Sequence, residues 1–298
     1  MTASPPSRRP SAQASDRPPS QASDPSPSRC RALEFCVLAS GSRGNATYVS
    51  DGRTAVLVDA GLSGAEIQRR MARRGLSPEN LDAVLVTHEH GDHVRGVGVL
   101  ARRFGLPVYL SPGAARALDG RLGTIADLRH FRAGEAFPLG SLTVHPFATS
   151  HDAADPVGFT LGGGNRRLGI ATDLGMATQL VRHHLRGCSA VILETNHDPD
   201  LLMNGPYPWR LKQRVRGRSG HLSNGDARDL LLDILHARLS HVVLGHLSEE
   251  NNRPELALAL IREALDGRCP AATVRVAGQN DGSERLRLGE ADPGEPAD

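Results

Sequence analysis

Short apolar segments alternate with amphipathic segments along most of the chain. The apolar segments are bounded by polar residues, glycine or proline, which is typical of strands. Strands are expected at residues 35–38, 47–49, 55–59, 81–86, 108–110, 142–147, 158–161, 168–171, 190–194, 242–244 and 273–276. Helices are expected at residues 65–74, 114–118, 176–186, 224–237 and 254–265. The alternation of the two patterns indicates a mixed α/β domain.

The two ends of the chain differ in composition from the segment between them. Residues 1–29 are dominated by Pro and Ser with scattered Arg and Asp, and they bury too little apolar surface to offset the entropic cost of ordering. We expect residues 1–29 to be a disordered tail, or to include residues upstream of the true start. The folded domain is expected at residues 30–285, followed by a flexible C-terminal tail at residues 286–298.

Composition and charge restrict the class of protein only weakly. The 35 Lys and Arg residues nearly balance the 33 Asp and Glu residues, so the net charge of +2 does not by itself indicate a nucleic-acid partner. No segment approaches the roughly 20 apolar residues of a membrane span, and the N-terminus lacks the apolar core of a secretory signal. Cys30, Cys36, Cys188 and Cys269 form no CxxC pair or regular framework, which favours a reducing compartment. We therefore expect a cytoplasmic protein without a membrane partner.

Four potential metal ligands lie together after a strand-like apolar segment. They are His88, His90, Asp92 and His93, in the sequence Thr-His-Glu-His-Gly-Asp-His. On such a turn His88 and His90 share one direction. Asp92 and His93 lie closer to a helix expected to begin near Val94, so they face a neighbouring position and one loop supplies two adjacent cations. Imidazole with carboxylate suits Zn or Mn, with Fe as a further candidate, better than Mg or Ca. The alternative is a solvated polar loop.

The motif at residues 87–93 resembles the signature of the metallo-β-lactamase superfamily, and further motifs of that family follow in order within residues 33–277. The resemblance implies an α/β (αββα) fold in which two packed mixed β-sheets are flanked by helices. It also implies two divalent metal ions, one held by His88, His90 and His151 and the other by Asp92, His93 and His246, with Asp173 shared between them. Asp59 resembles the family's early aspartate, which supports the ligand loop rather than binding metal. Taken singly, His151 or His246 is as readily an ordinary loop or strand-end histidine.

His90 distinguishes two kinds of chemistry within this fold. Flavo-diiron oxidoreductases resemble the motif but have Glu at the position of His90, so the histidine favours hydrolysis over redox chemistry. Two metal ions a few ångströms apart acidify a shared water and stabilise charge on the attacked group, which serves esters, thioesters, lactams and phosphodiesters alike. The fold and the metals alone therefore leave the substrate open.

Two residues in the second half of the chain point to phosphodiesters. Glu194 follows an expected strand and His221 precedes an expected helix, an arrangement that resembles the Glu and Gly-His-Ser pair of the ribonuclease Z branch. By that resemblance His221 protonates the leaving oxygen and Glu194 orients it. Asp92 and Asp173 complete the catalytic set. A proton donor with a pKa near the working pH suits an alkoxide leaving group. The alternative is that His221 and Ser223 only cap the helix.

A basic segment at residues 207–218 lies between Glu194 and His221. It interleaves cations with two aromatic residues, a pattern that suits a phosphate backbone and a stacked base. The alternative is a solvated basic surface strand. The predicted substrate-binding residues are Trp209, Arg210, Lys212, Arg214, Arg216 and Arg218 from this segment, with Ser42 and Asn45 from a glycine-rich loop. Backbone N–H groups of that loop are candidates for contact with a phosphate.

The chain resembles the YycJ (WalJ) type subfamily over nearly the whole folded region. The similar segments are Ser40 to Asn45, Ser150 to Phe159, Asn196 to Asn224 and His246 to Asn252. The resemblance implies a metal-dependent phosphodiesterase that acts as a 5′-to-3′ exonuclease, with DNA rather than RNA as its partner. The alternatives are a thioesterase or lactamase-like hydrolase of a small molecule, similar to glyoxalase II, and a metal-stabilised binding protein.

Overall fold

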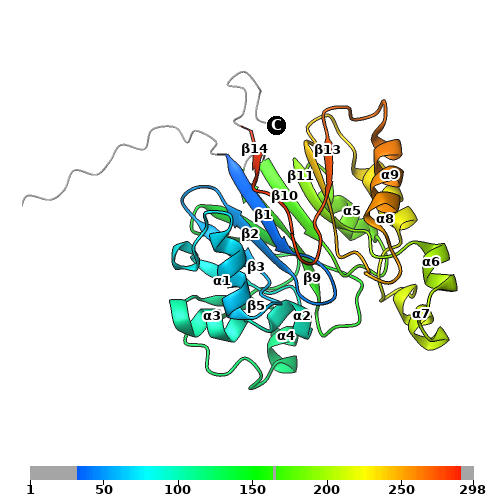
Figure 1. Ribbon diagram of the computed structural model, residues 1–298. Helices are drawn as coiled ribbons and strands as arrows, with labels where there is room; N and C mark the ends of the chain where they lie inside the picture. The colour runs from blue at the N-terminus through cyan, green and yellow to red at the C-terminus, as the bar shows by residue number, and fades with distance from the viewer. Residues whose placement is uncertain (1–31, 164–165, 290–298) are drawn as a thin grey trace, which may run out of the picture.

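The computed structural model describes residues 32–163 and 166–289, whose strands form two sheets (Figure 1). The first sheet has the strand order β14 (Leu286–Leu288), β1 (Leu33–Ala39), β2 (Ala46–Ser50), β3 (Ala55–Val58), β4 (Ala83–Leu85), β5 (Val108–Leu110) and β6 (Leu128–His130). The second sheet has the order β13 (Thr273–Val276), β12 (His241–Gly245), β11 (Ala190–Glu194), β10 (Arg166–Ala171), β9 (Val157–Gly163), β8 (Leu142–Ala148) and β7 (Phe137–Leu139). The tail expected at residues 1–29 lies outside the described residues.

Each sheet has an antiparallel part and a parallel part. In the first sheet β14, β1, β2 and β3 pair antiparallel, whereas β3 to β6 pair parallel. In the second sheet β7 to β10 pair antiparallel and β10 to β13 pair parallel. Ligands of such sheets gather at the carboxyl ends of parallel strands, and the candidate residues after β3, β4, β10, β11 and β12 all lie there. The register of β11 and β12 sets Glu194 opposite Gly245, next to His246.

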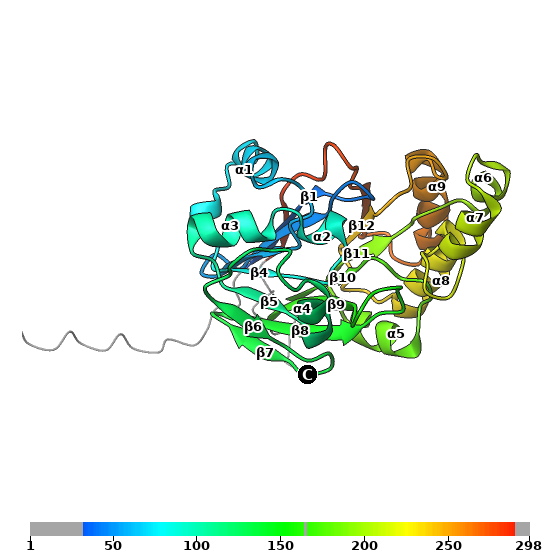
Figure 2. The same cartoon turned by 90° about the horizontal axis from the view of Figure 1, so that it is seen from below.

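The helices lie on the outer faces of the sheets (Figures 1 and 2). The first half of the chain contributes α1 (Gly64–Ala72), a 3-10 turn at Pro78–Asn80, α2 (Gly91–Val94), α3 (Val97–Phe104) and α4 (Pro112–Ala117). The second half contributes α5 (Gln179–Leu185), α6 (Pro199–Asn204), α7 (Trp209–Val215), α8 (Asn224–Ile234) and α9 (Pro254–Leu265). In both views α6 and α7 lie at the edge of the molecule, beside α8 and α9.

The apolar core has three layers that correspond to this arrangement. Leu85 and Phe159 are buried between the two sheets. Ile67 of α1 packs with the outer face of the first sheet, and Leu230 of α8 and Ile261 of α9 pack with the outer face of the second. Because both faces of the central strands are covered, β1 and β11 are buried at every position, and their sequences are apolar except for Glu34 and Glu194 rather than alternating. The predicted αββα fold is confirmed.

Some elements differ from those expected. Leu286–Leu288 forms β14 and pairs with β1, so the prediction that the C-terminal tail begins at residue 286 is wrong for these three residues. Leu286 and Leu288 are buried because they cover the edge of β1 and complete the core between the sheets. The helix after the ligand loop begins at Gly91 rather than near Val94. Among the described residues, no helix is both long and apolar enough to cross a membrane.

Candidate metal centre

The ligand loop after β4 is held in place by the carboxylate of Asp59. Asp59 Oδ1 accepts a hydrogen bond of 2.8 Å from Thr87 N, and Oδ2 accepts from Thr87 Oγ1 at 2.9 Å and from His93 Nδ1 at 2.8 Å. Thr87 Oγ1 in turn lies 3.0 Å from Nδ1 of His88. These contacts leave Nε2 of both histidines to face the centre of the site. A carboxylate behind a histidine is the usual way in which proteins fix the orientation of a metal ligand.

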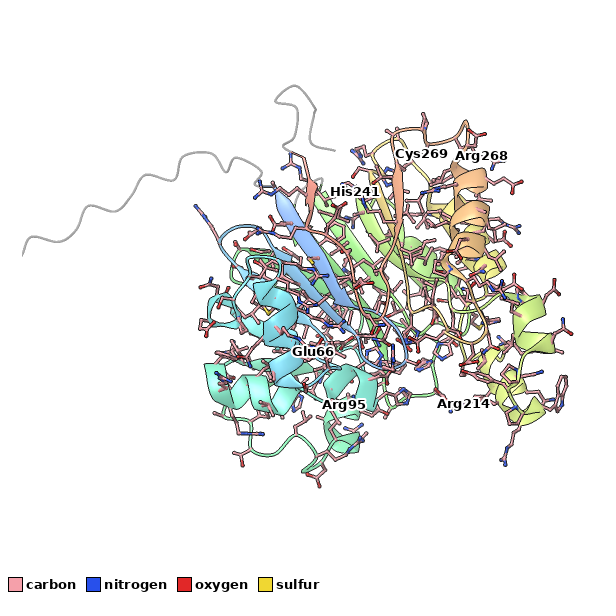
Figure 3. The ribbon with its side chains drawn as sticks, in the orientation of Figure 1. Glu66, Arg95, Arg214, His241, Arg268 and Cys269 are labelled. Atoms are coloured by element: carbon pink, nitrogen blue, oxygen red, sulfur yellow. The ribbon has the colours of Figure 1, made fainter. Side chains whose placement is uncertain are left out.

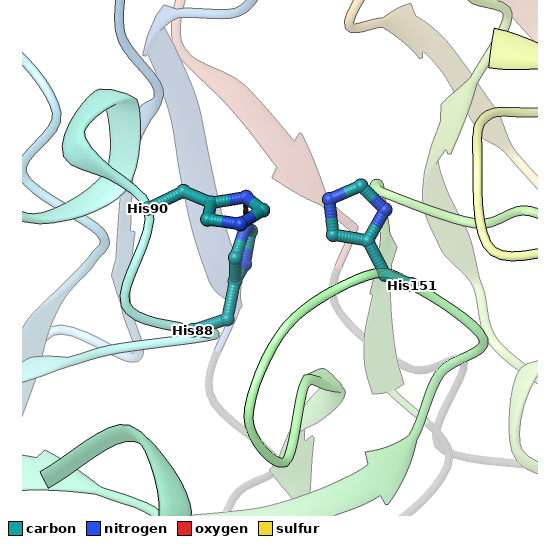
Figure 4. A group of neighbouring side chains, drawn as sticks. All are labelled: His88, His90 and His151. Carbon is teal, nitrogen blue, oxygen red and sulfur yellow. Dashed lines mark hydrogen bonds between the residues drawn. The ribbon is translucent and has the colours of Figure 1, made fainter. Parts of the chain in front are cut away.

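Three histidines converge on one position. His88, His90 and His151 each have a ring nitrogen within 4.8 Å of the others. Figure 4 shows their rings turned toward one another, His88 and His90 from the loop after β4 and His151 from the loop after β8. His151 Nδ1 donates a hydrogen bond of 3.1 Å to the carbonyl of Gly220, which directs Nε2 inward. This group matches the ligand set expected for one metal ion.

A second group lies directly beside the first. Asp92, His93 and His246 have ligand atoms within 4.8 Å of one another. Asp173 lies between the two groups, because its Oδ2 is 3.3 Å from His93 Nε2 and its Oδ1 is 3.6 Å from His151 Nε2. All seven side chains that the sequence proposed as metal ligands therefore meet at one place.

Three residues of the site have a left-handed backbone. Asp59, Asp173 and His246 follow β3, β10 and β12, and their φ angles are 61°, 58° and 53°. Asp and His adopt this conformation more readily than most residues, but it still costs on the order of 1–3 kcal/mol each. The conformation ends each strand abruptly and turns the side chain toward the site. Such strain is typical of functional positions.

The chemistry of the donors fits divalent cations. Among the described residues, His246 Nε2 and Asp173 Oδ2 are buried and have no hydrogen-bond partner. Burial lowers the pKa of His246, but Asp173 outweighs it and the pKa lies well above its usual value. Burial raises the pKa of Asp173, yet the neighbouring imidazoles, His246 first among them, hold it far below its usual value. A metal cation bound in place of the histidine protons would be stabilised by the same negative charge of Asp173.

Glu194 connects this centre to His221. Glu194 is fully buried, and its Oε1 accepts hydrogen bonds from His221 Nδ1 at 2.8 Å and from His246 Nδ1 at 2.9 Å. Its Oε2 accepts from the backbone N–H groups of Leu174 and Leu222 at 2.7 and 3.2 Å. Both oxygens are engaged, so Glu194 orients the two histidines rather than offering a free ligand. Burial raises the pKa of Glu194, but these contacts, His221 foremost, lower it to about 2.

The helix-cap alternative for this region is partly correct. Ser223 is the N-cap of α8 and shares a capping box with Asp226. His221 takes no part in that cap. Its Nδ1 donates a hydrogen bond to Glu194, and its ring centroid lies 5.1 Å from that of His151. The cap therefore belongs to Ser223, and His221 belongs to the site.

Both the sequence and the fold are similar to known proteins of one superfamily. Residues 54–246 match the family described as the beta-lactamase superfamily domain. The exodeoxyribonuclease YycJ of Bacillus anthracis is 38% identical over 236 residues, which cover 78% of this chain and 89% of the relative. The exodeoxyribonuclease WalJ of Streptococcus pneumoniae serotype 2 (strain D39) is 38% identical over 228 residues, which cover 75% of this chain and 85% of the relative.

The chain belongs to the β-lactamase superfamily. Within it, the resemblance to the YycJ (WalJ) type subfamily is confirmed by these two relatives. The fold is also that of YhfI from Bacillus subtilis, a metallo-β-lactamase fold protein, with a TM-score of 0.65 at 15% identity over 86% of this chain and 99% of that one.

The basic segment of this superfamily member is a helix, not an extended strand. An extended segment sets alternate residues on one side, whereas α7 sets Arg210 and Arg214 on one face and Lys212 and Arg216 on the opposite face. Pro208 stands at the N-cap, and the Arg, Leu, Lys and Gln residues after it favour a helix. The alternative of a solvated basic surface strand is therefore wrong, because residues 209–215 are helical.

The basic residues of α7 have different surroundings. Arg214, labelled in Figure 3, is largely exposed and donates from Nε to Asp152 Oδ2 at 2.7 Å. Lys212 Nζ donates to the carbonyl of Met203 at 2.7 Å, so it ties α7 to α6. Two pockets have His221 in their lining. Trp209 is 57% exposed and lies outside both linings, as do Arg210, Lys212 and Arg218.

The glycine-rich loop mainly supports the site from behind. Asn45 is only 6% exposed, and its Nδ2 lies 3.1 Å from His93 Nε2, so its predicted role in binding substrate is wrong. The loop's backbone N–H groups donate within the protein: Gly41 N to Asn45 Oδ1 at 2.9 Å, Arg43 N to Gln279 Oε1 at 2.7 Å, and Asn45 N to Asp92 O at 2.8 Å. Ser42, in contrast, is exposed beside the site.

A cleft of about 160 Å³ opens from the metal centre toward α7. We call it the Tyr207 cleft, and its lining includes Ser42, Tyr207, Arg214, His221 and His246. Asp152 also lines it and connects Arg214 to the candidate ligand His151, since its Oδ1 lies 3.4 Å from His151 Nε2. No role for Asp152 was predicted from the sequence, although it directly follows the candidate ligand His151.

Proposed function

We propose that the chain is a dinuclear metal-dependent exodeoxyribonuclease that digests DNA in the 5′-to-3′ direction. The observation that carries the proposal is the hydrogen bond of 2.8 Å between His221 Nδ1 and the buried Glu194, beside the candidate metal ligands. His221 Nδ1 also lies 3.8 Å from Asp173 Oδ1. A proton donor at this position suits the alkoxide that leaves a phosphodiester. The names of the two similar exodeoxyribonucleases support DNA as the substrate.

The two histidine-rich groups are the proposed metal sites. One ion would be held by His88, His90 and His151 and the other by Asp92, His93 and His246, with Asp173 shared. Zinc or manganese suits this set of imidazoles and carboxylates, and iron is the alternative. When bound, the two ions supply a hydroxide nucleophile near neutral pH and stabilise negative charge on the attacked phosphate.

His221 holds the proton that the departing oxygen takes up. Burial lowers the pKa of His221, but the Glu194 carboxylate outweighs it and raises the pKa above its usual value. The protonated ring is therefore available near neutral pH. Because His221 Nδ1 donates its hydrogen bond to Glu194, Nε2 is the nitrogen that faces the departing oxygen. The same carboxylate orients His246, so one buried residue aligns the proton donor with a metal ligand.

The Tyr207 cleft is the proposed path of the DNA strand into the site. Arg214 offers a guanidinium to a backbone phosphate, Ser42 offers a hydroxyl, and Tyr207 offers a ring on which a base can stack. We also propose a cytoplasmic location, because Cys36, Cys188 and Cys269 are buried free thiols.

The test is a comparison of substrates with one metal-loaded preparation. We expect it to shorten a 5′-phosphorylated DNA duplex from the 5′ end faster than it cleaves single-stranded DNA or RNA. Hydrolysis of a thioester or a chromogenic lactam at a comparable rate, without cleavage of any nucleic acid, would reject the proposal in favour of a small-molecule hydrolase. Tight binding of DNA by the metal-loaded protein without cleavage would instead identify a binding protein.

A further inference from the structure

A second pocket, which we call the Met203 pocket, shares His221 as part of its wall. It has a volume of about 230 Å³ and lies between α6 and the start of α8. Its lining includes His197, Leu202, Met203, Arg216 and His221. The two pockets therefore meet at the proposed proton donor.

One side of the Met203 pocket is apolar. Pro199, Leu202 and Met203 of α6 form this side, and Met203 remains 38% exposed even though the side chain is apolar. A planar heterocycle packs well against such a surface, because apolar contact is available without a matching set of hydrogen bonds. The size is below the roughly 300–1,000 Å³ of sites for larger ligands, so the pocket suits one base rather than several.

The other side of the pocket is polar and contains an unpartnered buried group. His197 is 3% exposed, and among the described residues its Nδ1 has no hydrogen-bond partner. The backbone carbonyl of His197 accepts a hydrogen bond of 2.9 Å from Asn224 N, which fixes the residue to the start of α8. Asp226, an exposed residue, lines the same side, and its Oδ2 also accepts a hydrogen bond of 2.6 Å from Ser223 Oγ. These groups can pair with the donors and acceptors on the edge of a base.

A cation lies at the rim of the pocket. Arg216 is exposed, and in the described chain its guanidinium makes one weak contact, from Nη1 to Met203 Sδ at 3.6 Å. The remaining donors of this guanidinium face solvent and suit the two oxygens of a phosphate group. An apolar wall, polar groups and a cation at the rim together match a nucleoside monophosphate.

We infer that the Met203 pocket binds the 5′-terminal nucleotide that the reaction releases, with its base against Leu202 and Met203 and its 5′-phosphate at Arg216. The inference rests on the proposed function. In that reaction hydroxide forms a new bond to phosphorus, the bond from phosphorus to O3′ breaks, and the proton of His221 Nε2 goes to O3′. The departing nucleoside must therefore lie against His221, which is one of the residues that line this pocket. A pocket for one nucleotide makes mononucleotides the product.

The test is calorimetric titration of the metal-loaded protein with thymidine 5′-monophosphate and with thymidine. Met203→Trp fills the pocket, and we expect it to weaken binding of the monophosphate by on the order of tenfold or more. Asn204→Trp is the matched control, because it adds the same ring at an exposed neighbouring position of α6 outside the pocket lining. It should bind the monophosphate as the unmodified protein does.

Arg216→Ala is a second variant that does not depend on the folding of Met203→Trp. It should weaken binding of the monophosphate by about tenfold and leave binding of thymidine unchanged. Equal affinities of Met203→Trp and Asn204→Trp, or no binding by the unmodified protein, would overturn the inference. Digestion of a 5′-phosphorylated duplex is measured in parallel. A protein that digests DNA but shows equal affinities rejects the pocket alone, and one that digests no nucleic acid rejects the proposed function.

Discussion

The two halves of the molecule build the candidate site in different ways. Both halves have a seven-stranded sheet with an antiparallel and a parallel part, within the described residues. The first half supplies His88, His90, Asp92 and His93 from one short segment after β4. The second half supplies His151, Asp173 and His246 from separate loops, together with Glu194 and His221. A compact motif thus identifies a metal centre, whereas the dispersed residues determine which reaction the centre performs.

Loss of a ligand from the compact motif should have the largest effect. His88 is buried in the three-histidine group, so His88→Ala should remove metal and reduce cleavage of DNA to background. Metal analysis by mass spectrometry and a duplex digestion assay check both outcomes. His130→Ala, an exposed histidine of β6, is the matched control and should change neither. Normal metal content in His88→Ala would contradict the ligand assignment.

Loss of His221 should separate catalysis from metal binding. His221→Ala removes the proposed proton donor but none of the seven proposed ligands, so turnover should fall by roughly 10²–10⁴-fold with the metal content intact. The measurement is the single-turnover rate of phosphodiester cleavage at saturating metal. An unchanged rate would mean that the leaving oxygen takes its proton from another source.

Variants of the two supporting carboxylates, Asp59 and Glu194, allow a direct comparison of the two halves. Asp59→Asn loosens His93 and Thr87, whereas Glu194→Gln loosens both His246 and His221. Substitution of a residue that hydrogen-bonds to a metal ligand lowers metal affinity or activity by about 10–100-fold. We expect excess metal to restore the activity of Asp59→Asn but not that of Glu194→Gln. In Glu194→Gln the proposed proton donor His221 also loses the carboxylate that orients it. Equal rescue of the two variants would show that Glu194 acts only through the metal.

The sequence predicted the strands that carry the site for a physical reason. Strands covered on both faces, such as β11 with its apolar residues 190–193 before Glu194, are nearly continuous apolar runs that are recognisable in the sequence. β6 was not predicted because all three residues of Leu128–His130 are exposed. α7 was not predicted because only Val215 of this helix is buried, so it has no apolar stripe.

The site was predictable where its residues follow one another in the chain. The order of motifs also identified His151, but its orientation depends on the carbonyl of Gly220, a contact between residues 69 positions apart. The inward position of Asn45 and the Met203 pocket arise only from such distant contacts. No local pattern in the sequence distinguishes them.

The smallest effect should come from the basic residues of α7. Arg214→Ala removes a cation that lines the Tyr207 cleft, whereas Arg210→Ala removes one of equal charge outside the linings of both pockets. Arg214→Ala should weaken DNA binding and reduce the slope of log affinity against log salt by about 1. Arg210→Ala should change both quantities less. The same loss in both variants would mean that α7 acts only through its total charge.

The most direct test of the account is a titration of the metal-free protein with zinc or manganese, in which bound metal and the rate of 5′-end digestion of duplex DNA are measured together. If the two halves form one dinuclear nuclease site, the rate rises until two ions are bound per chain and then stays constant. Full activity with one bound ion, or two bound ions without digestion of DNA, would contradict the account.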